Sequence, residues 1–447
     1  MKFSNILSII ILGQSAYGQS SCKKITTRKE VNDMTLKDWE VYQSTIAKAQ
    51  TTTDKDYPGG LSIWEAAADF HNKISNEIHW SCVFLFWHRL FIKNVETKLQ
   101  QINPDFFFPY FDSSRVWDKV DNSLVWKYLG TKGNPVDDPI FKKNKLKEGG
   151  NSRALQRDYT SLNGRVPSME QYNQIYQQSL AGGGYPFYAK HMEAIHGVFH
   201  TQCGGNGGQM ANMYSPLDPL FYMHHGHFDS MLVQAQAGWT TYGKSQVGGN
   251  TAKGETCTLN TKIPGYNNRI GDVLEVRNLC VHYALPGEKS NGASTNPADY
   301  PNGGLTPTGT RSAQATQTAG ANPSNVPSYQ YPPDYVHCNK CFPSLPESWL
   351  KMQQQGSKDT DLNEIAKLLD TTCNKIVEQV KTGYIVPPMP AYPAESRPVV
   401  SYNSTDSKYT PPTGPIDVQP NYSVATNGCA ESSSFVVLAL GLATFLL

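Results

Sequence analysis

The histidines of this chain gather in one part of the sequence, and their spacing constrains the fold more than any other feature. The chain has 447 residues and 11 histidines, and nine of these lie between His71 and His227. Two sets of three have spacings that allow their side chains to meet: His71, His79 and His88, and then His196, His200 and His225. Because neutral imidazole is the commonest side-chain metal ligand, the pattern predicts two neighbouring metal sites.

The second set is expected on two helices. His196 and His200 are four residues apart, which places both imidazoles on one helical face. Asp218 followed by Pro219 is a typical helix start. On the helix that follows, His225 shares an apolar stripe, whereas His224 is turned about 100° away. The predicted ligand is therefore His225. The apolar stripe consists of Phe221, His225, Phe228 and Leu232.

The first set requires a break in the chain. His79 and His88 are nine residues apart, so one straight helix would put them on opposite faces. Helical spacing resumes at Phe84, which predicts a break near residues 81–83. His71 lies on an earlier helix, expected over residues 63–74.

The composition of the two sets favours one metal. Zinc hydrolases mix histidine with carboxylate or thiolate ligands, and diiron bundles use Glu-x-x-His pairs. Ligation by imidazole alone suits copper, so the sequence predicts a pair of copper ions.

Two segments carry a resemblance to a known family. Phe84-Leu-Phe-Trp-His-Arg-Leu-Phe91 and Asp218-Pro-Leu-Phe-Tyr-Met-His-His-Gly-His-Phe-Asp229 resemble the two copper segments of type-3 (dinuclear) copper proteins of the tyrosinase and catechol oxidase family, in its short fungal form. Weaker similarities include Gln156-Arg-Asp158 and Leu345-Pro-Glu-Ser-Trp349. The resemblance implies a mainly α fold, with a four-helix bundle around a dicopper site and long irregular loops. It also implies one copper on His71, His79 and His88, and the other on His196, His200 and His225.

The resemblance further implies a function. Members of this family bind O2 on the copper pair and oxidise o-diphenols to o-quinones, and tyrosinases also hydroxylate monophenols. We therefore expect an extracellular phenol oxidase that uses O2 and small phenols, with a role in pigment formation or wall crosslinking. Two alternatives stay open: a hemocyanin-like O2-binding protein and an o-aminophenol oxidase.

Three residues are candidates for substrate control. Gly197 stands where many tyrosinases have an asparagine that polarises a water, so its missing side chain favours diphenol oxidation. Glu193 is either the base, a residue that orients a ligand imidazole, or one partner of a structural salt bridge. Met213 lies near the family's bulky gate position or is ordinary core. His224 and His227 are expected to form hydrogen bonds behind the ligands.

The chain departs from the family pattern at two positions. Ser230 replaces the arginine that often follows the aspartate equivalent to Asp229, so we expect an ion pair to be lost. Some members crosslink a ligand histidine to a cysteine, but none stands two residues before His79. Cys82 is therefore predicted to form a disulfide.

The two ends of the chain predict its compartment. Residues 1–18 read as a signal peptide, with Gln19 the first mature residue. Residues 428–447 resemble a glycosylphosphatidylinositol-anchor signal that is removed, the alternative being an incidental apolar tail. Its loss would remove Cys429 and leave eight cysteines, enough for four disulfides of undetermined pairing. The net charge of +1 argues against nucleic acid as a partner.

Three further segments complete the organisation. Residues 19–383 are expected to form the dicopper domain, interrupted by a low-complexity excursion over residues 286–335. Helical spacing over residues 361–381 predicts a helix that packs back on this domain. Residues 384–427, with the sequons at Asn403 and Asn421, are predicted to form an exposed, glycosylated stalk that would leave the lipid anchor as the only membrane contact.

Overall fold

The computed structural model describes residues 22–138, 140–141, 144–158, 165–286, 331, 335–341, 345–353, 362–389, 409 and 416–422. The predicted signal peptide, the anchor signal, Asn403 and almost all of the 286–335 excursion lie outside these residues. Within the part of the chain that is described, no helix is both long and apolar enough to cross a bilayer.

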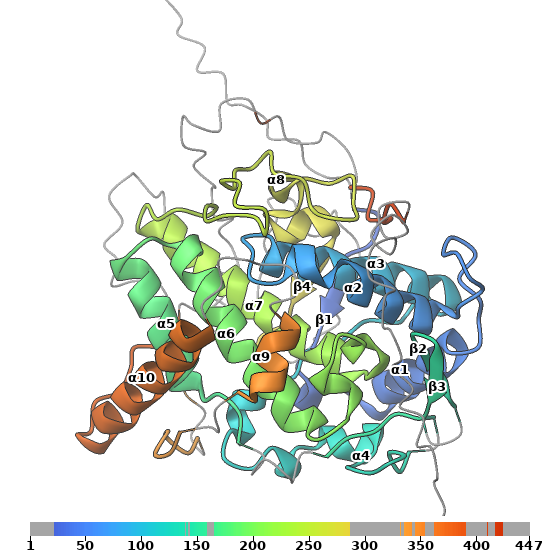
Figure 1. The fold of residues 1–447 in the computed structure, drawn as a ribbon, viewed down its shortest axis with the longest axis horizontal. Helices are drawn as coiled ribbons and strands as arrows, with labels where there is room; N and C mark the ends of the chain where they lie inside the picture. The colour runs from blue at the N-terminus through green and yellow to red at the C-terminus, as the bar shows by residue number, and fades with distance from the viewer. Residues whose placement is uncertain are drawn as a thin grey trace, which may run out of the picture.

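Four long helices form the centre of the molecule (Figure 1): α2 (Ile63–Ile78), α3 (Phe84–Ile102), α6 (Tyr185–Gly204) and α7 (Leu220–Thr241). Two more flank them, α1 (Leu36–Ala49) and α5 (Met169–Ala181). The short helices are α4 (Val125–Leu129), α8 (Ile270–Val273) and α9 (Glu347–Gln353), and α10 (Leu362–Lys381) lies beside α5. The expected mainly α fold with a helical bundle and long loops is confirmed.

The helix boundaries follow from local chemistry. Ser62 and Glu65 form a capping box at the start of α2. The Asp218 carboxylate accepts a hydrogen bond from the Leu220 backbone N–H, 3.0 Å away, at the start of α7. The predicted break between His79 and His88 is present, because α2 ends at Ile78 and α3 begins at Phe84.

Two small sheets complete the secondary structure. β1 (Thr26–Arg28) pairs in parallel with β4 (Val281–Tyr283), with Thr26 opposite Val281. β2 (Leu146–Glu148) and β3 (Asn151–Arg153) form an antiparallel hairpin. The β1–β4 pair joins chain segments more than 250 residues apart, and the Cys22–Cys280 disulfide, with a sequence separation of 258, fastens the same junction.

Helix α7 runs through the middle of the core. Every residue from Leu220 to Val233 is buried. A helix that is buried on all sides has no solvent face, so its apolar stripe does not define which side chains point to the centre.

The helix expected over residues 361–381 is present as α10, which packs against α5 and α6. Its buried residues include Leu369, Cys373 and Ile376, which belong to the predicted stripe. The Cys341–Cys373 disulfide ties it to the segment that precedes α9.

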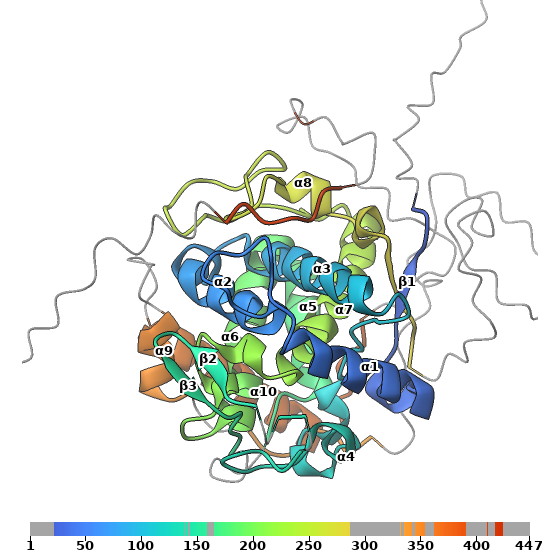
Figure 2. The same cartoon turned by 90° about the vertical axis from the view of Figure 1, so that its right-hand side faces the viewer.

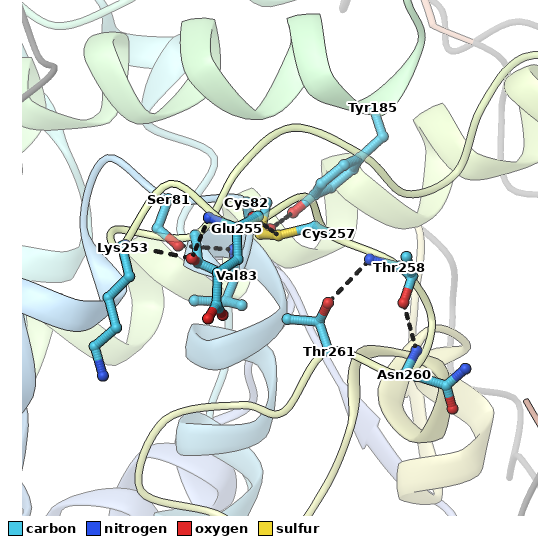
Figure 3. The surroundings of a disulfide bond; sticks show 11 residues. Ser81, Cys82, Val83, Tyr185, Lys253, Glu255, Cys257, Thr258, Asn260 and Thr261 are labelled. Atoms are coloured by element: carbon cyan, nitrogen blue, oxygen red, sulfur yellow. Dashed lines mark hydrogen bonds between the residues drawn. A yellow bond between two sulfur atoms is a disulfide. The ribbon is translucent and has the colours of Figure 1, made fainter.

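The disulfide predictions are partly corrected. Cys82 is bonded to Cys257, as Figure 3 shows, and the Tyr185 hydroxyl donates to the Cys82 carbonyl beside it. The expected fourth disulfide is absent from the described residues, because Cys203 and Cys338 are free and buried. An even number of cysteines permits pairing, but a disulfide also needs Cα atoms within about 7 Å.

The end of the described chain lies against the domain rather than away from it. The Lys98 ammonium donates to the Tyr422 hydroxyl, 2.9 Å away, and Tyr422 packs edge-on against Tyr57. The Asn421 backbone N–H donates to the Gly265 carbonyl. Figure 2 shows this segment in red beside the loops of α8. The predicted exposed stalk is therefore wrong for residues 416–422, because aromatic burial holds them to the domain.

Candidate metal centre

The first histidine set meets in the core as predicted. His71 comes from α2, His79 directly follows α2, and His88 comes from the first turns of α3. One nitrogen of each lies within 4.8 Å of the others, and all three side chains are buried. The break between the two helices is what brings His79 and His88 to the same point.

Backbone carbonyls fix the orientation of these three imidazoles. The Nδ1 atom of His71 lies 2.8 Å from the Met213 carbonyl oxygen. That of His79 lies 3.0 Å from the Ser75 carbonyl, and that of His88 lies 2.8 Å from the Phe84 carbonyl. A carbonyl can only accept, so Nδ1 carries the proton and Nε2 keeps its lone pair. The Nε2 atoms of His71 and His88 are buried without a hydrogen-bond partner.

The second set is built in the same way on α6. The Nδ1–H of His196 donates to the Glu193 carbonyl at 2.7 Å, and that of His200 donates to the Met210 carbonyl at 2.8 Å. Both Nε2 atoms are thereby left free of protons, as metal ligation by neutral imidazole requires.

Helix α7 brings two histidines to this second cluster rather than one. His224 has a nitrogen within 4.8 Å of nitrogens of His196 and His200. The Nε2 of His225 is 3.3 Å from the Nε2 of His200. The ring of His225 also stacks on His88 with centroids 4.0 Å apart. His224 is predicted to turn away from the centre, but it is fully buried, and the three-histidine group in the described residues is His196, His200 and His224 rather than the set with His225.

The two clusters face each other across a short distance. The rings of His79 and His196 are 6.4 Å apart between centroids, and Phe84 lies 4.7 Å from both His88 and His196. A site for two metal ions between the clusters is therefore shared by four helices.

Burial keeps these imidazoles neutral. It lowers the pKa of His79 to about 4 and that of His200 to about 3, and it depresses the pKa of His71, His88 and His196 well below the usual value of free histidine. Neutral imidazole is the form that binds metal. Neutral histidines with oriented Nε2 lone pairs, and no carboxylate or thiolate in either cluster of the described residues, fit a pair of copper ions.

Glu193 holds the break after His79. Its carboxylate accepts a hydrogen bond from the Trp80 backbone N–H at 2.6 Å, and burial raises the pKa of this carboxyl well above its usual value. Trp80 itself has a left-handed backbone with φ of 50°, which costs energy for a residue with a side chain. The Glu193 carboxylate thus contacts the backbone of the turn after His79.

The two other candidates for substrate control are also placed near the histidines. Met213 supplies the carbonyl that orients His71, and its side chain is buried. Gly197 lies on α6 between His196 and His200, and it faces Trp349 and Leu345 of the segment around α9.

Ser230 forms no ion pair and its hydroxyl donates to the His227 carbonyl, whereas Asp229 itself is paired. Its Oδ1 is 2.5 Å from the Nε of Arg89, and both side chains are buried. The Tyr283 hydroxyl donates to its other oxygen at 2.7 Å. The Asp229 carboxylate is therefore paired with Arg89 of α3, and Arg28 of β1 lies 3.8 Å from its Oδ2. Sequence reasoning missed Arg89 although it directly follows His88 in the first copper segment.

Behind the second cluster, His227 contacts an acidic group. Its Nε2 lies 3.4 Å from Asp112 Oδ1, but neither ring nitrogen has a hydrogen-bond partner among the described residues, so the hydrogen bond expected of His227 is not present. Arg157, within one of the weaker family similarities, forms a buried bidentate pair with Asp218 at 2.6 and 2.7 Å, which anchors the start of α7.

Comparison with known proteins agrees with this geometry. Residues 61–237, which include every histidine of the two clusters, match the common central domain of tyrosinase. This segment of the chain is therefore similar to the central domain of the type-3 copper family. The chain's similarity to the tyrosinase of Streptomyces antibioticus is 27% identity over 176 residues, covering 35% of this chain and 64% of that protein.

Another relative is matched over a smaller share of its own length. A putative tyrosinase-like protein of Caenorhabditis elegans is 26% identical over 235 residues, covering 49% of this chain and 31% of that protein. The chain thus spans less than two thirds of the length of these relatives. Among solved structures, a polyphenol oxidase variant from Thermothelomyces thermophila aligns with a TM-score of 0.44 and 19% identity, covering 60% of this chain and 91% of that chain.

Proposed function

We propose that the protein is an extracellular copper oxidase that oxidises o-diphenols to o-quinones with O2. The observation that carries the proposal is the pair of facing histidine clusters, in which backbone carbonyls hold Nδ1–H and leave Nε2 for metal. Bound copper supplies O2 binding and reversible electron transfer, which imidazoles lack.

The chain's own residues hold this chemistry in place. Carbonyls of Met213, Ser75 and Phe84 fix the imidazoles of the first cluster, and the Glu193 carboxylate holds the turn between them. Phe84 and Phe221 pack against imidazoles of both clusters. We assign one copper to His71, His79 and His88, and the other to His196, His200 and His225.

The electron balance is simple. Each o-diphenol gives two electrons and two protons as its two C–O bonds become carbonyls. Two diphenols therefore reduce one O2 to two waters. Gly197 offers no side chain to activate a water for monophenol deprotonation, which supports diphenols as the principal substrates.

An extracellular location is supported by the three disulfides, which persist in oxidising surroundings. We propose that the signal peptide directs secretion and that a lipid anchor holds the protein at the cell surface. Expression of a chain that ends at residue 427 tests the anchor: activity should move to the medium, whereas activity that stays on the cells contradicts it.

The enzyme proposal is tested by O2 uptake with catechol and with phenol side by side, using copper-loaded protein. Uptake with catechol is expected to exceed uptake with phenol. Reversible O2 binding without uptake, at two coppers per chain, would favour an oxygen carrier of the hemocyanin kind. Faster uptake with o-aminophenol than with catechol would favour the third alternative.

A further inference from the structure

Trp349 of α9 packs directly on the helix that carries His196 and His200. A Cβ atom added to Gly197 would lie 2.7 Å from Trp349 Nε1 and 3.5 Å from Leu345 Cδ1. Contacts under 3.0 Å are not tolerated without movement, and an indole is a rigid group. Gly197 therefore provides the space that Trp349 fills.

The same indole covers one of the clustered imidazoles. The rings of Trp349 and His200 are stacked, with centroids 5.3 Å apart and an angle of 27° between planes. Only 3% of Trp349 is exposed. Figures 1 and 2 both show α9 lying against α6, on the outside of the histidine-bearing bundle.

The chain just before α9 is fastened to α5 and α10. The Cys341–Cys373 disulfide ties it to α10. The buried Glu170 carboxylate accepts hydrogen bonds from the Tyr335 hydroxyl at 2.6 Å and from His337 Nδ1 at 2.7 Å. Leu350, on α9 itself, is also buried. A segment held by a covalent bond and buried polar contacts is a fixed part of the site.

We propose that Trp349 is a specificity-determining residue, a fixed wall beside the second copper cluster that limits the bulk of the phenols able to reach it. This inference rests on the proposed phenol oxidase function. It also gives Gly197 a second role. The glycine leaves room for the Trp349 indole, in addition to lacking a side chain that could activate a water.

The first test compares two diphenols of different bulk, catechol and 4-tert-butylcatechol. Trp349→Ala should raise the ratio of kcat/KM for the bulky substrate to that for catechol about tenfold or more, since pocket shape discriminates by such factors. Leu350→Ala, a matched loss of packing on the same helix, should leave the ratio unchanged. An unchanged ratio in Trp349→Ala overturns the proposal. So does an equal rise in kcat/KM for both substrates, which would mean that Trp349 occludes the site for every phenol.

The second test needs no activity. It is a double-mutant cycle: Gly197→Ala is made once in the wild-type protein and once in the Trp349→Ala variant. The Tm of each copper-free protein is then measured. With Trp349 present, the substitution should lower Tm because the methyl group meets the indole. Without it, the substitution should raise Tm, as alanine favours a helix interior. If Gly197→Ala changes Tm by the same amount with and without Trp349, the proposed contact between Gly197 and Trp349 is wrong. If catechol is not oxidised by any copper-loaded variant, the proposed function fails while this cycle still decides the placement of Trp349.

Discussion

The Arg89 guanidinium and the Asp229 carboxylate form a buried ion pair between α3 and α7, with Nε 2.5 Å from Oδ1. Arg89 directly follows His88, and Asp229 lies one helical turn after His225. Arg89 also donates to the carbonyls of Val273 and Leu274 and to the Gln236 side chain. The pair therefore links α3, which carries His88, to α7, which carries His225.

Breaking this pair should loosen both clusters. Asp229→Asn leaves the Arg89 charge buried without its counter-ion, which typically costs about 3–5 kcal/mol. We expect the free energy of unfolding to fall by that order and copper content to fall below two per chain, as measured by urea unfolding and metal analysis. Lys253→Ala, which removes an exposed ion pair with Glu77, is the control and should change neither. Full stability and two coppers in Asp229→Asn would contradict the account.

The copper content of two variants shows whether His224 or His225 is the copper ligand. We expect His225→Ala to lose one copper per chain, because His225 Nε2 lies 3.3 Å from His200 Nε2. His224→Ala should retain two coppers, since its ring is stacked on Phe199. The opposite result would assign the second copper to His196, His200 and His224.

The copper-free protein should lose stability as the pH falls below the ordinary histidine pKa. Burial lowers the pKa of His79 to about 4 and of His200 to about 3. The unfolded chain therefore binds more protons than the folded chain below about pH 6.5, and stability is present above that pH and lost as the pH falls toward 4. Urea unfolding at several pH values measures this slope, and His79→Gln should reduce it. An equal slope in that variant would contradict the burial argument.

The role of Glu193 can be decided with two substitutions. If its carboxylate only holds the turn at Trp80, Glu193→Gln should keep two coppers and most activity, because an amide oxygen also accepts from the Trp80 N–H. Glu193→Ala should lose copper from the first cluster. A Glu193→Gln enzyme with two coppers and no activity would instead identify the residue as the base.

Gly197→Asn tests the preference for diphenols. The substitution has to be made both with Trp349 and with Trp349→Ala, because Trp349 contacts Gly197. The asparagine side chain would meet the indole, so the single variant should be destabilised. In the Trp349→Ala background, Gly197→Asn should raise the ratio of monophenol to diphenol activity in O2-uptake assays. An unchanged ratio there would remove Gly197 from the control of substrate choice.

The site was predictable to the extent that histidine spacing determines geometry. The nine-residue interval between His79 and His88 demands a break, and the structure has it. The choice between His224 and His225 was not predictable from an apolar stripe, because α7 is buried on every side.

Contacts between distant segments could not be read from the sequence. Arg89 of α3 pairs with Asp229 of α7, and no local pattern in the sequence predicts such a pair. Trp349 reaches Gly197 from a segment about 150 residues later in the chain. The pairing of cysteines and the docking of Tyr422 depend on the same kind of long-range packing.

The most direct test of the central claim is a copper titration of the copper-free protein, followed by catechol-dependent O2 uptake. We predict that O2 uptake rises with added copper and reaches its plateau at two coppers per chain, because both histidine clusters are needed. A plateau at one copper per chain, or no uptake with two coppers bound, would contradict it.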